Sequence, residues 1–183
     1  MGLRSAGAIF MPSRAVFPGG AAEPCDALLP PGAMGAAHLG PAERSLALTA
    51  IRELWEETGL ILGRPGRFDA LSGWKDFAAT GCMPSCDTLR YVFRAITPPA
   101  RPRRFDARFF LADASAVAGG ADAPLGGDGE LGDLRWIPLD AVDDLKLAFV
   151  TRMVLAEVRV FIAGRHYSGV PVWDGERGTV RRR

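Results

Sequence analysis

Two stretches of the chain carry apolar residues at helical spacing. The first runs from Pro41 to Thr58, where Pro41 suits an opening helical turn and Gly59 suits the position just past the end. Its apolar stripe consists of Leu46, Ala47, Ala50, Ile51 and Leu54. The second covers residues 147–163, with an inner side made of Leu147, Val150, Val154, Leu155, Val158 and Ile162. The pattern therefore predicts two long helices.

Shorter apolar runs predict strands. They cover residues 8–20, which end in a Pro-Gly-Gly turn, and residues 68–77 with a turn, 89–96, 108–112 and 133–139. A short helix is expected to begin within 139–142. Segments 21–40 and 116–132 are rich in Gly and Ala without a period and are expected to be loops, and residues 164–183 a solvated tail. This order predicts one mixed α/β domain over residues 1–183, with helices covering a mixed or antiparallel sheet.

Composition narrows the class of protein. The 183 residues are 48% apolar and 23% charged, enough for one domain with a sizeable core. The net charge of +1 gives no global field for nucleic acid or anionic membrane. No run reaches the roughly 18 apolar residues of a membrane helix, and the first residues lack a signal-peptide layout. Three cysteines at spacings unlike a zinc site fit a reducing compartment, so we expect a cytoplasmic location.

The chemistry-bearing feature is a cluster of glutamates. Glu53, Glu56 and Glu57 stand at i, i+3 and i+4, so a helix places them on one face. Like charges there repel, and the helix C-terminal half disfavours anions. A divalent cation would relieve both effects, and oxygen ligands suit Mg²⁺ or Mn²⁺. Arg52, four residues before Glu56, could brace the carboxylates. The plain alternative is a solvated acidic helix face.

The segment 52–60, RELWEETGL, resembles the second half of the Nudix box, whose pattern is G-x5-E-x7-R-E-U-x-E-E-x-G-U with U aliphatic. The matching positions are Arg52, Glu53, Leu54, Glu56, Glu57, Gly59 and Leu60. Residues 17–20 (FPGG) resemble the strand and turn that open the box, and residues 134–139 resemble an element that follows the last core strands. The resemblance spans roughly residues 8–160. It implies a Nudix-like α/β/α sandwich with a mixed sheet and the box helix packed on it.

The resemblance implies Mg²⁺-dependent hydrolysis of a nucleoside diphosphate linked to another moiety, with Mn²⁺ as a substitute. Glu53, Glu56 and Glu57 would be the metal ligands, with Arg52 orienting them. Gly20 would let the backbone approach the metal and the diphosphate. A loop carboxylate often serves as general base, and Glu130 is the candidate, with Asp87 a weaker one; a surface role for Glu130 is equally open.

The chain departs from the family pattern before the helix. Counting back eight residues from Arg52 reaches Arg44, where the family has its first Glu, whereas counting six on from Gly20 reaches Asp26. We read this as 18 residues inserted between the glycine turn and the helix, with the first Glu replaced. Glu43, one position before Arg44, could compensate only if the first turn of the helix is irregular. We expect activity to survive; the alternative is a Nudix-like binding or interaction module with little or no turnover.

Another departure lies at the start of the chain. Members usually have a strand before FPGG, and residues 1–4 could be the end of it. An open sheet edge there makes a homodimer a hypothesis. A coenzyme A motif would need Arg and Gly where Ile9 and Ser13 stand, so the substrate stays unassigned.

A basic cluster follows the third expected strand, at Arg101, Arg103, Arg104 and Arg108. Alternation would put Arg104 and Arg108 on one face with Asp106, and Phe105 and Phe109 on the other. The two arginines could contact substrate phosphate or ribose; protective charge on an edge strand is the favoured alternative. The aromatic residues Trp74, Tyr91 and Trp136 could stack a base, although such residues more often belong to the core.

Overall fold

The computed structural model describes residues 1–7, 12–29, 35–165, 168–175 and 180–182. Within these ranges the strands form three hydrogen-bonded sheets. The first contains β1 (Gly2–Arg4), β2 (Ala15–Val16) and β7 (Leu131–Gly132), in the order β2-β1-β7. The second pairs β3 (Gly63–Pro65) with β4 (Cys82–Pro84). The third contains β5 (Arg90–Ile96), β6 (Asp106–Leu111), β8 (Pro171–Trp173) and β9 (Val180–Arg182), in the order β6-β5-β8-β9.

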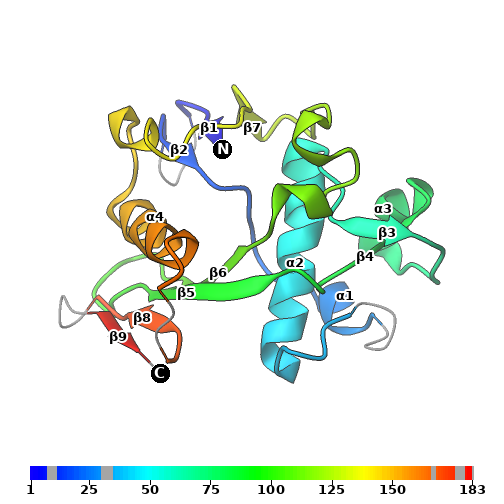
Figure 1. Cartoon of the computed structure of the whole chain (residues 1–183), viewed down its shortest axis with the longest axis horizontal. Helices are drawn as coiled ribbons and strands as arrows, with labels where there is room; N and C mark the ends of the chain where they lie inside the picture. Colours follow the sequence, from blue (N-terminus) through cyan, green and yellow to red (C-terminus); the bar gives the residue numbers. More distant parts are fainter. Residues whose placement is uncertain (8–11, 30–34, 166–167, 176–179, 183) are drawn as a thin grey trace.

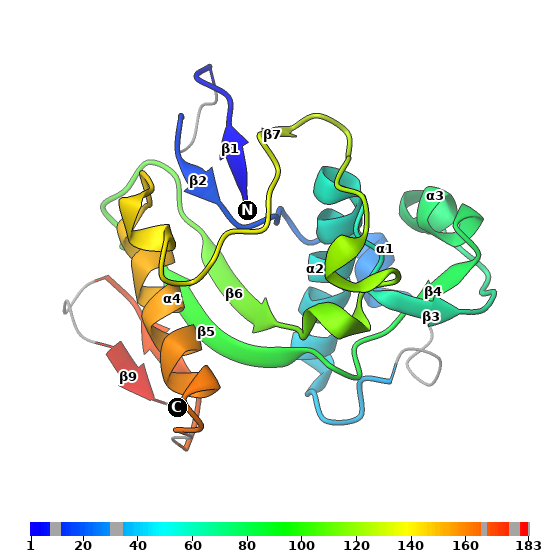
Figure 2. The same ribbon diagram turned by 45° about the horizontal axis from the view of Figure 1, so that its top comes forward.

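The third sheet is mixed, because β5 pairs antiparallel with β6 and parallel with β8. Figure 2 shows β5 and β6 passing between helix α2 (Pro41–Thr58) and helix α4 (Phe149–Ile162). On the α4 side, Phe93 and Ala95 of β5 bury against Val154. The α/β/α arrangement with a mixed sheet is thus confirmed, although hydrogen bonding divides the strands into three sheets rather than one.

Helix α2 has the predicted bounds because both ends carry strong local signals. Pro41 occupies its first turn, and Gly59 ends it with a left-handed backbone (φ 73°) whose N–H donates to the Trp55 carbonyl at 2.7 Å. Ala47, Leu48 and Ile51 are fully buried, whereas Leu46 and Ala50 are only partly so. A second buried side carries Thr49, Arg52 and Glu57. The helix is therefore covered on two sides, and one of the two is polar.

The short helix α1 (Pro24–Ala27) supplies that polar cover and packs along α2 (Figure 1). It lies inside segment 21–40, which was expected to be a loop. Its N-terminus is closed by a capping box between Glu23 and Asp26. Segment 21–40 therefore begins with ordered structure next to α2.

Other elements differ from expectation. Residues 68–77 contain no strand. Their end forms a 3-10 turn (η2, Ser72–Trp74) and the start of α3 (Lys75–Ala79). Trp74 of η2 and Phe77 of α3 are buried in the core. Residues 133–139 pair with no strand, and the short helix after them is a 3-10 turn (η5, Val142–Asp144). The loop expected at 116–132 is only partly irregular: the 3-10 turn η3 (Ala114–Ala116) overlaps its start, the turn η4 (Gly120–Asp122) lies inside it, and β7 forms its end.

The ends of the chain also join the sheets. β1 occupies the first residues, and part of the expected solvated tail forms β8 and β9. In α4, Val154 and Leu155 are buried as predicted, but Ile162 is 65% exposed. Residues 8–11 of the expected first strand lie outside the described residues, and only Ala15–Val16 of its remainder is a strand. Among the helices that the structure describes, none is long and apolar enough to cross a membrane.

Candidate active site

The candidate site is organised around the guanidinium of Arg52, which is only 3% exposed. Its Nη1 donates to Glu53 Oε1 and to Glu56 Oε2, both at 2.9 Å. Its Nη2 donates to the Ala21 carbonyl at 3.0 Å, in the segment between β2 and α1. One side chain therefore holds two carboxylates of α2 and the glycine-rich segment together.

The buried counter-ion of Arg52 is Asp26 on α1, which is 0% exposed. Its two oxygens accept from Arg52 Nε at 3.0 Å and from Nη2 at 3.1 Å. The same carboxylate accepts from Thr49 Oγ1 at 2.8 Å, from Trp74 Nε1 at 3.2 Å and from the Glu23 N–H at 3.0 Å. Burial alone would raise the pKa of Asp26, but the Arg52 and other hydrogen bonds outweigh it, so the pKa is lowered. Asp26 is therefore ionised and fixed.

The glycine turn at residues 19–20 lies against Glu57 and Glu53. The Gly19 N–H donates to Glu57 Oε2 at 2.7 Å. A Cβ on Gly20 would stand 2.4 to 2.5 Å from the carboxylate atoms of Glu53. Only glycine at position 20 lets the backbone pass this close to Glu53 without moving it.

A second loop closes over the end of α2. The Gly126 N–H donates to the Thr58 carbonyl and the Asp128 N–H to the Glu56 carbonyl, both at 2.8 Å. Gly127 has φ 147°, and a Cβ there would stand 2.4 Å from the Glu57 carbonyl oxygen. This docking brings Glu130 close enough to act electrostatically on the site, where its side chain pairs with Arg4 at 2.9 Å.

Burial and mutual repulsion set the charge state of the carboxylates. Burial raises the pKa of Glu57 to about 7; the Gly19 N–H opposes this rise, while Glu130 and Glu53 add to it. Burial also raises the pKa of Glu53 and of Glu56, against the lowering effect of Arg52. These are side chains that a nearby cation would favour in the ionised form.

Comparison with known proteins agrees with this geometry. The family model of the NUDIX domain matches residues 4–158. The chain belongs to the Nudix family. A crystal structure of a NUDIX hydrolase from Alicyclobacillus acidocaldarius is 30% identical, with a TM-score of 0.66 over 85% of this chain and 80% of that one. None of the curated proteins compared with the chain matches it.

The structure corrects one interpretation of the Nudix box. We expected its first acid to be replaced by Arg44, with Glu43 compensating only if the first turn of the helix were irregular. In fact Asp26, six residues after Gly20, is the acid that binds Arg52. Helix α2 is regular from Pro41, so Glu43 lies far along it from Arg52, beside a separate hollow that also involves Arg90 and Arg94. The insertion therefore follows the acid rather than preceding it.

The carboxylate oxygens of Glu53, Glu56 and Glu57, next to a glycine-rich backbone, are the type of ligand that a hard divalent cation prefers. Within the described residues, however, no three acidic, histidine or cysteine side chains stand together at metal-binding spacing. Glu53 and Glu56 are turned to Arg52, and Glu57 is turned to Gly19. A bound ion would thus have to compete with these contacts.

The basic cluster of β6 lies elsewhere. Arg108 and Arg94 both pair with Asp106, at 2.9 and 2.7 Å, and Arg104 Nε donates to the Thr97 carbonyl at 3.3 Å. Arg108 and Asp106 share a face as expected, while Phe109 packs into the core. Arg104 and Arg108 thus each have a partner on or beside the β5–β6 pair, which favours the protective surface role.

The other candidate residues are dispersed. Trp74 is fully buried and donates to Asp26, so it belongs to the core, while Tyr91 packs on Phe110 and Trp136 is 49% exposed. Asp87 is paired with Arg64 at 3.8 Å, outside the carboxylate cluster.

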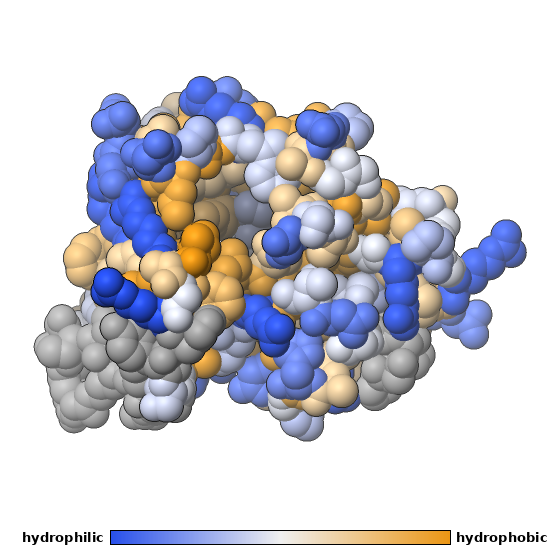
Figure 3. Space-filling view, in the orientation of Figure 1, coloured by the Kyte–Doolittle hydropathy of each residue, from blue (hydrophilic) through white to orange (hydrophobic). Residues whose placement is uncertain are grey.

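Figure 3 shows a hollow between α4 and α2, over the segment that joins β2 to α1, with apolar residues along its α4 side. This segment carries Gly19 and Gly20, so the hollow adjoins the carboxylates.

Proposed function

We propose that the chain hydrolyses a nucleoside diphosphate linked to another moiety, in a reaction that depends on Mg²⁺. The observation that carries the proposal is the Arg52 cluster, in which Asp26, Glu53 and Glu56 converge on one guanidinium within a Nudix domain. Glu53, Glu56 and Glu57 would hold the metal ion. When bound, the ion would neutralise the diphosphate and activate a water molecule.

The protein residues have separable tasks in this proposal. Arg52 orients Glu53 and Glu56 and cannot lose its own charge. Gly19 and Gly20 keep the backbone close to Glu57 and Glu53, so that a diphosphate could approach these carboxylates and their metal ion. Glu130 would serve as general base, which requires it to leave Arg4. The hollow beside α4 would take the rest of the substrate.

A binding module with little turnover is the second candidate function. It is favoured by one observation: the box glutamates engage Arg52 and Gly19 rather than standing at metal-binding spacing. The two functions differ in whether product is released. The cytoplasmic location, the single-domain organisation, the homodimer and substrate contacts by Arg104 and Arg108 stay predictions.

A panel of nucleoside diphosphate derivatives tests the proposal. The protein is incubated with Mg²⁺ or with chelator, and phosphate-containing products are separated and quantified. We expect at least one compound to be cleaved only with Mg²⁺, and Glu57→Gln to slow cleavage at least about a hundredfold. Glu43→Gln, on the same helix but outside the cluster, is the matched control and keeps the rate. Binding of a compound without any cleavage would instead establish the module.

A further inference from the structure

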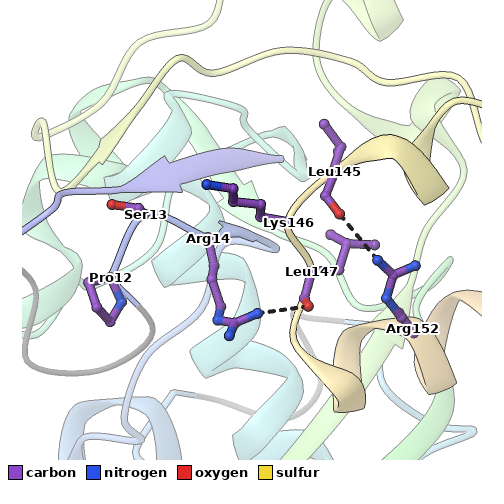
Figure 4. A pocket seen from close by; sticks show the side chains of 7 residues that line it. All are labelled: Pro12, Ser13, Arg14, Leu145, Lys146, Leu147 and Arg152. Carbon is purple, nitrogen blue, oxygen red and sulfur yellow. Dashed lines mark hydrogen bonds between the residues drawn. The ribbon is translucent and has the colours of Figure 1, made fainter.

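A basic pocket lies on the far side of β2 from β1, where the chain enters α4. It has a volume of about 440 Å³. Figure 4 shows its lining, which comes from the loop before β2, the segment between η5 and α4, and α4 itself. The lining residues are Pro12, Ser13, Arg14, Leu145, Lys146, Leu147 and Arg152. A parallel bridge from Ala15 to Leu147 holds the two walls together.

The pocket carries an unbalanced positive charge. Among the described residues that line it, Arg14, Lys146 and Arg152 are cationic and none is acidic. In the part of the chain that the structure describes, neither Arg14 nor Lys146 has a carboxylate partner. Asp143 is 3.7 Å from Arg152 but closer, at 2.8 Å, to Arg159, so it balances Arg152 only in part. The pocket therefore has positive charge that could bind an anion.

Two of the cations are held in place by backbone rather than by acids. Arg14 Nη1 donates to the Leu147 carbonyl at 3.0 Å, and Arg152 Nη2 donates to the Leu145 carbonyl at 3.3 Å. Both bonds are drawn in Figure 4. Ser13, whose hydroxyl is at the same rim, adopts a left-handed backbone (φ 54°) that is uncommon for serine. Charges fixed in this way need little reordering to meet a ligand.

We propose that this basic pocket binds a phosphate monoester group. Its volume exceeds that of one phosphate and leaves space for part of an organic group. Arg14 is five residues before Gly19, so their Cα atoms lie within about 18 Å of each other. The phosphate could therefore be the uncleaved end of the diphosphate substrate, a source that rests on the proposed function, or a separate phosphate compound.

Titration with inorganic phosphate tests the pocket. It is done calorimetrically at constant ionic strength in chelator, because the metal-free carboxylate cluster repels phosphate. Lys146→Gln and Arg14→Gln are each expected to weaken binding about five- to tenfold, as the loss of one charged contact predicts. Lys75→Gln and Arg67→Gln remove matched exposed charges elsewhere and are expected to leave binding unchanged. Lys146→Gln breaks no backbone hydrogen bond, so it decides the matter if Arg14→Gln fails to fold.

The proposal is overturned if wild-type protein shows no saturable phosphate binding, or if Lys75→Gln weakens it as much as Lys146→Gln. The source is then read from kinetics on a compound that the panel shows to be cleaved, with and without an extra terminal phosphate. A substrate phosphate predicts that Lys146→Gln raises KM only for the phosphorylated compound. A separate compound predicts unchanged KM for both. If the panel yields no substrate, the proposed function fails while the titration still judges the pocket.

Discussion

Replacing Asp26 with asparagine would remove the charge that balances Arg52 in the interior. The carboxylate accepts five hydrogen bonds from N–H and O–H donors of the described residues, two from Arg52 and one each from Thr49, Trp74 and the Glu23 N–H, besides a longer one from the Cys25 thiol. Each of its oxygens receives at least two of them. An amide nitrogen in either orientation would therefore face at least two donors. Arg52 would lose its fully buried counter-ion and keep only the more exposed carboxylates of Glu53 and Glu56.

The expected cost follows from burial. Breaking a buried ion pair by removing one partner costs about 3–5 kcal/mol, against a total stability of about 5–15 kcal/mol. For a chain of this size, that predicts a fall in Tm of about 6–20 °C. Urea unfolding followed by circular dichroism measures the free energy directly, and Tm is read from a thermal scan.

Two control variants change Glu43 and Arg44, the positions that counting back along the helix suggests for the first acid of the Nudix box. Glu43→Gln should change the free energy of unfolding by less than about 1 kcal/mol, since Glu43 lies in the first turn of α2 and forms no ion pair within the described residues. Arg44→Met should be neutral or stabilising, because Arg44 Nε is buried and has no hydrogen-bond partner among the described residues. The reasoning is refuted if Asp26→Asn unfolds within 1 kcal/mol of wild type, or if Glu43→Gln costs as much.

Three further predictions concern the rest of the site. Gly20→Ala should displace the Glu53 carboxylate and lower kcat at least about tenfold. It should change the free energy of unfolding by less than about 1 kcal/mol. An unchanged kcat would contradict the prediction. Gly127→Ala should cost about 2 kcal/mol or more by urea unfolding, whereas Gly126→Ala, which has open space, should cost under about 1 kcal/mol; equal costs would refute the docking of this loop. Without metal, Glu57 has a pKa of about 7 in the folded chain against about 4.5 when unfolded, so it should reduce stability as pH rises from 4.5 to 7, by up to about 3 kcal/mol. The difference in stability between wild type and Glu57→Gln should follow that slope, and a difference independent of pH would contradict it.

Local signals explain which parts of the fold were predictable. Helix α2 begins at a proline and ends at a glycine, and both residues act through their own backbone preferences. The strand expected at 89–96 is β5, one residue shorter, because alternation reports burial on one face. The period of the helix alone predicts that the three box glutamates lie on one face of α2.

Long-range pairing explains what was missed. Asp26 reaches Arg52 across 26 residues, and nothing in the intervening composition marks that contact. The count of six from Gly20 was the available signal, but counting back along the helix gave a competing position at Arg44. Similarly, β8 joins β5 by parallel pairing with a segment about 78 residues earlier, which no local pattern reports. The strand expected at 68–77 was wrong because its apolar residues Trp74 and Phe77 are buried in the core from a 3-10 turn and a short helix.

Manganese titration followed by electron paramagnetic resonance tests the central claim most directly, because the free ion gives the signal and the bound ion loses it. The account predicts saturable Mn²⁺ binding to wild-type protein, displaced by Mg²⁺, and at least about tenfold weaker binding in Glu56→Gln and in Glu57→Gln. Glu43→Gln should bind as wild type does. Equal Mn²⁺ binding by all four proteins, or none by wild type, would contradict the assignment of these carboxylates to a metal site.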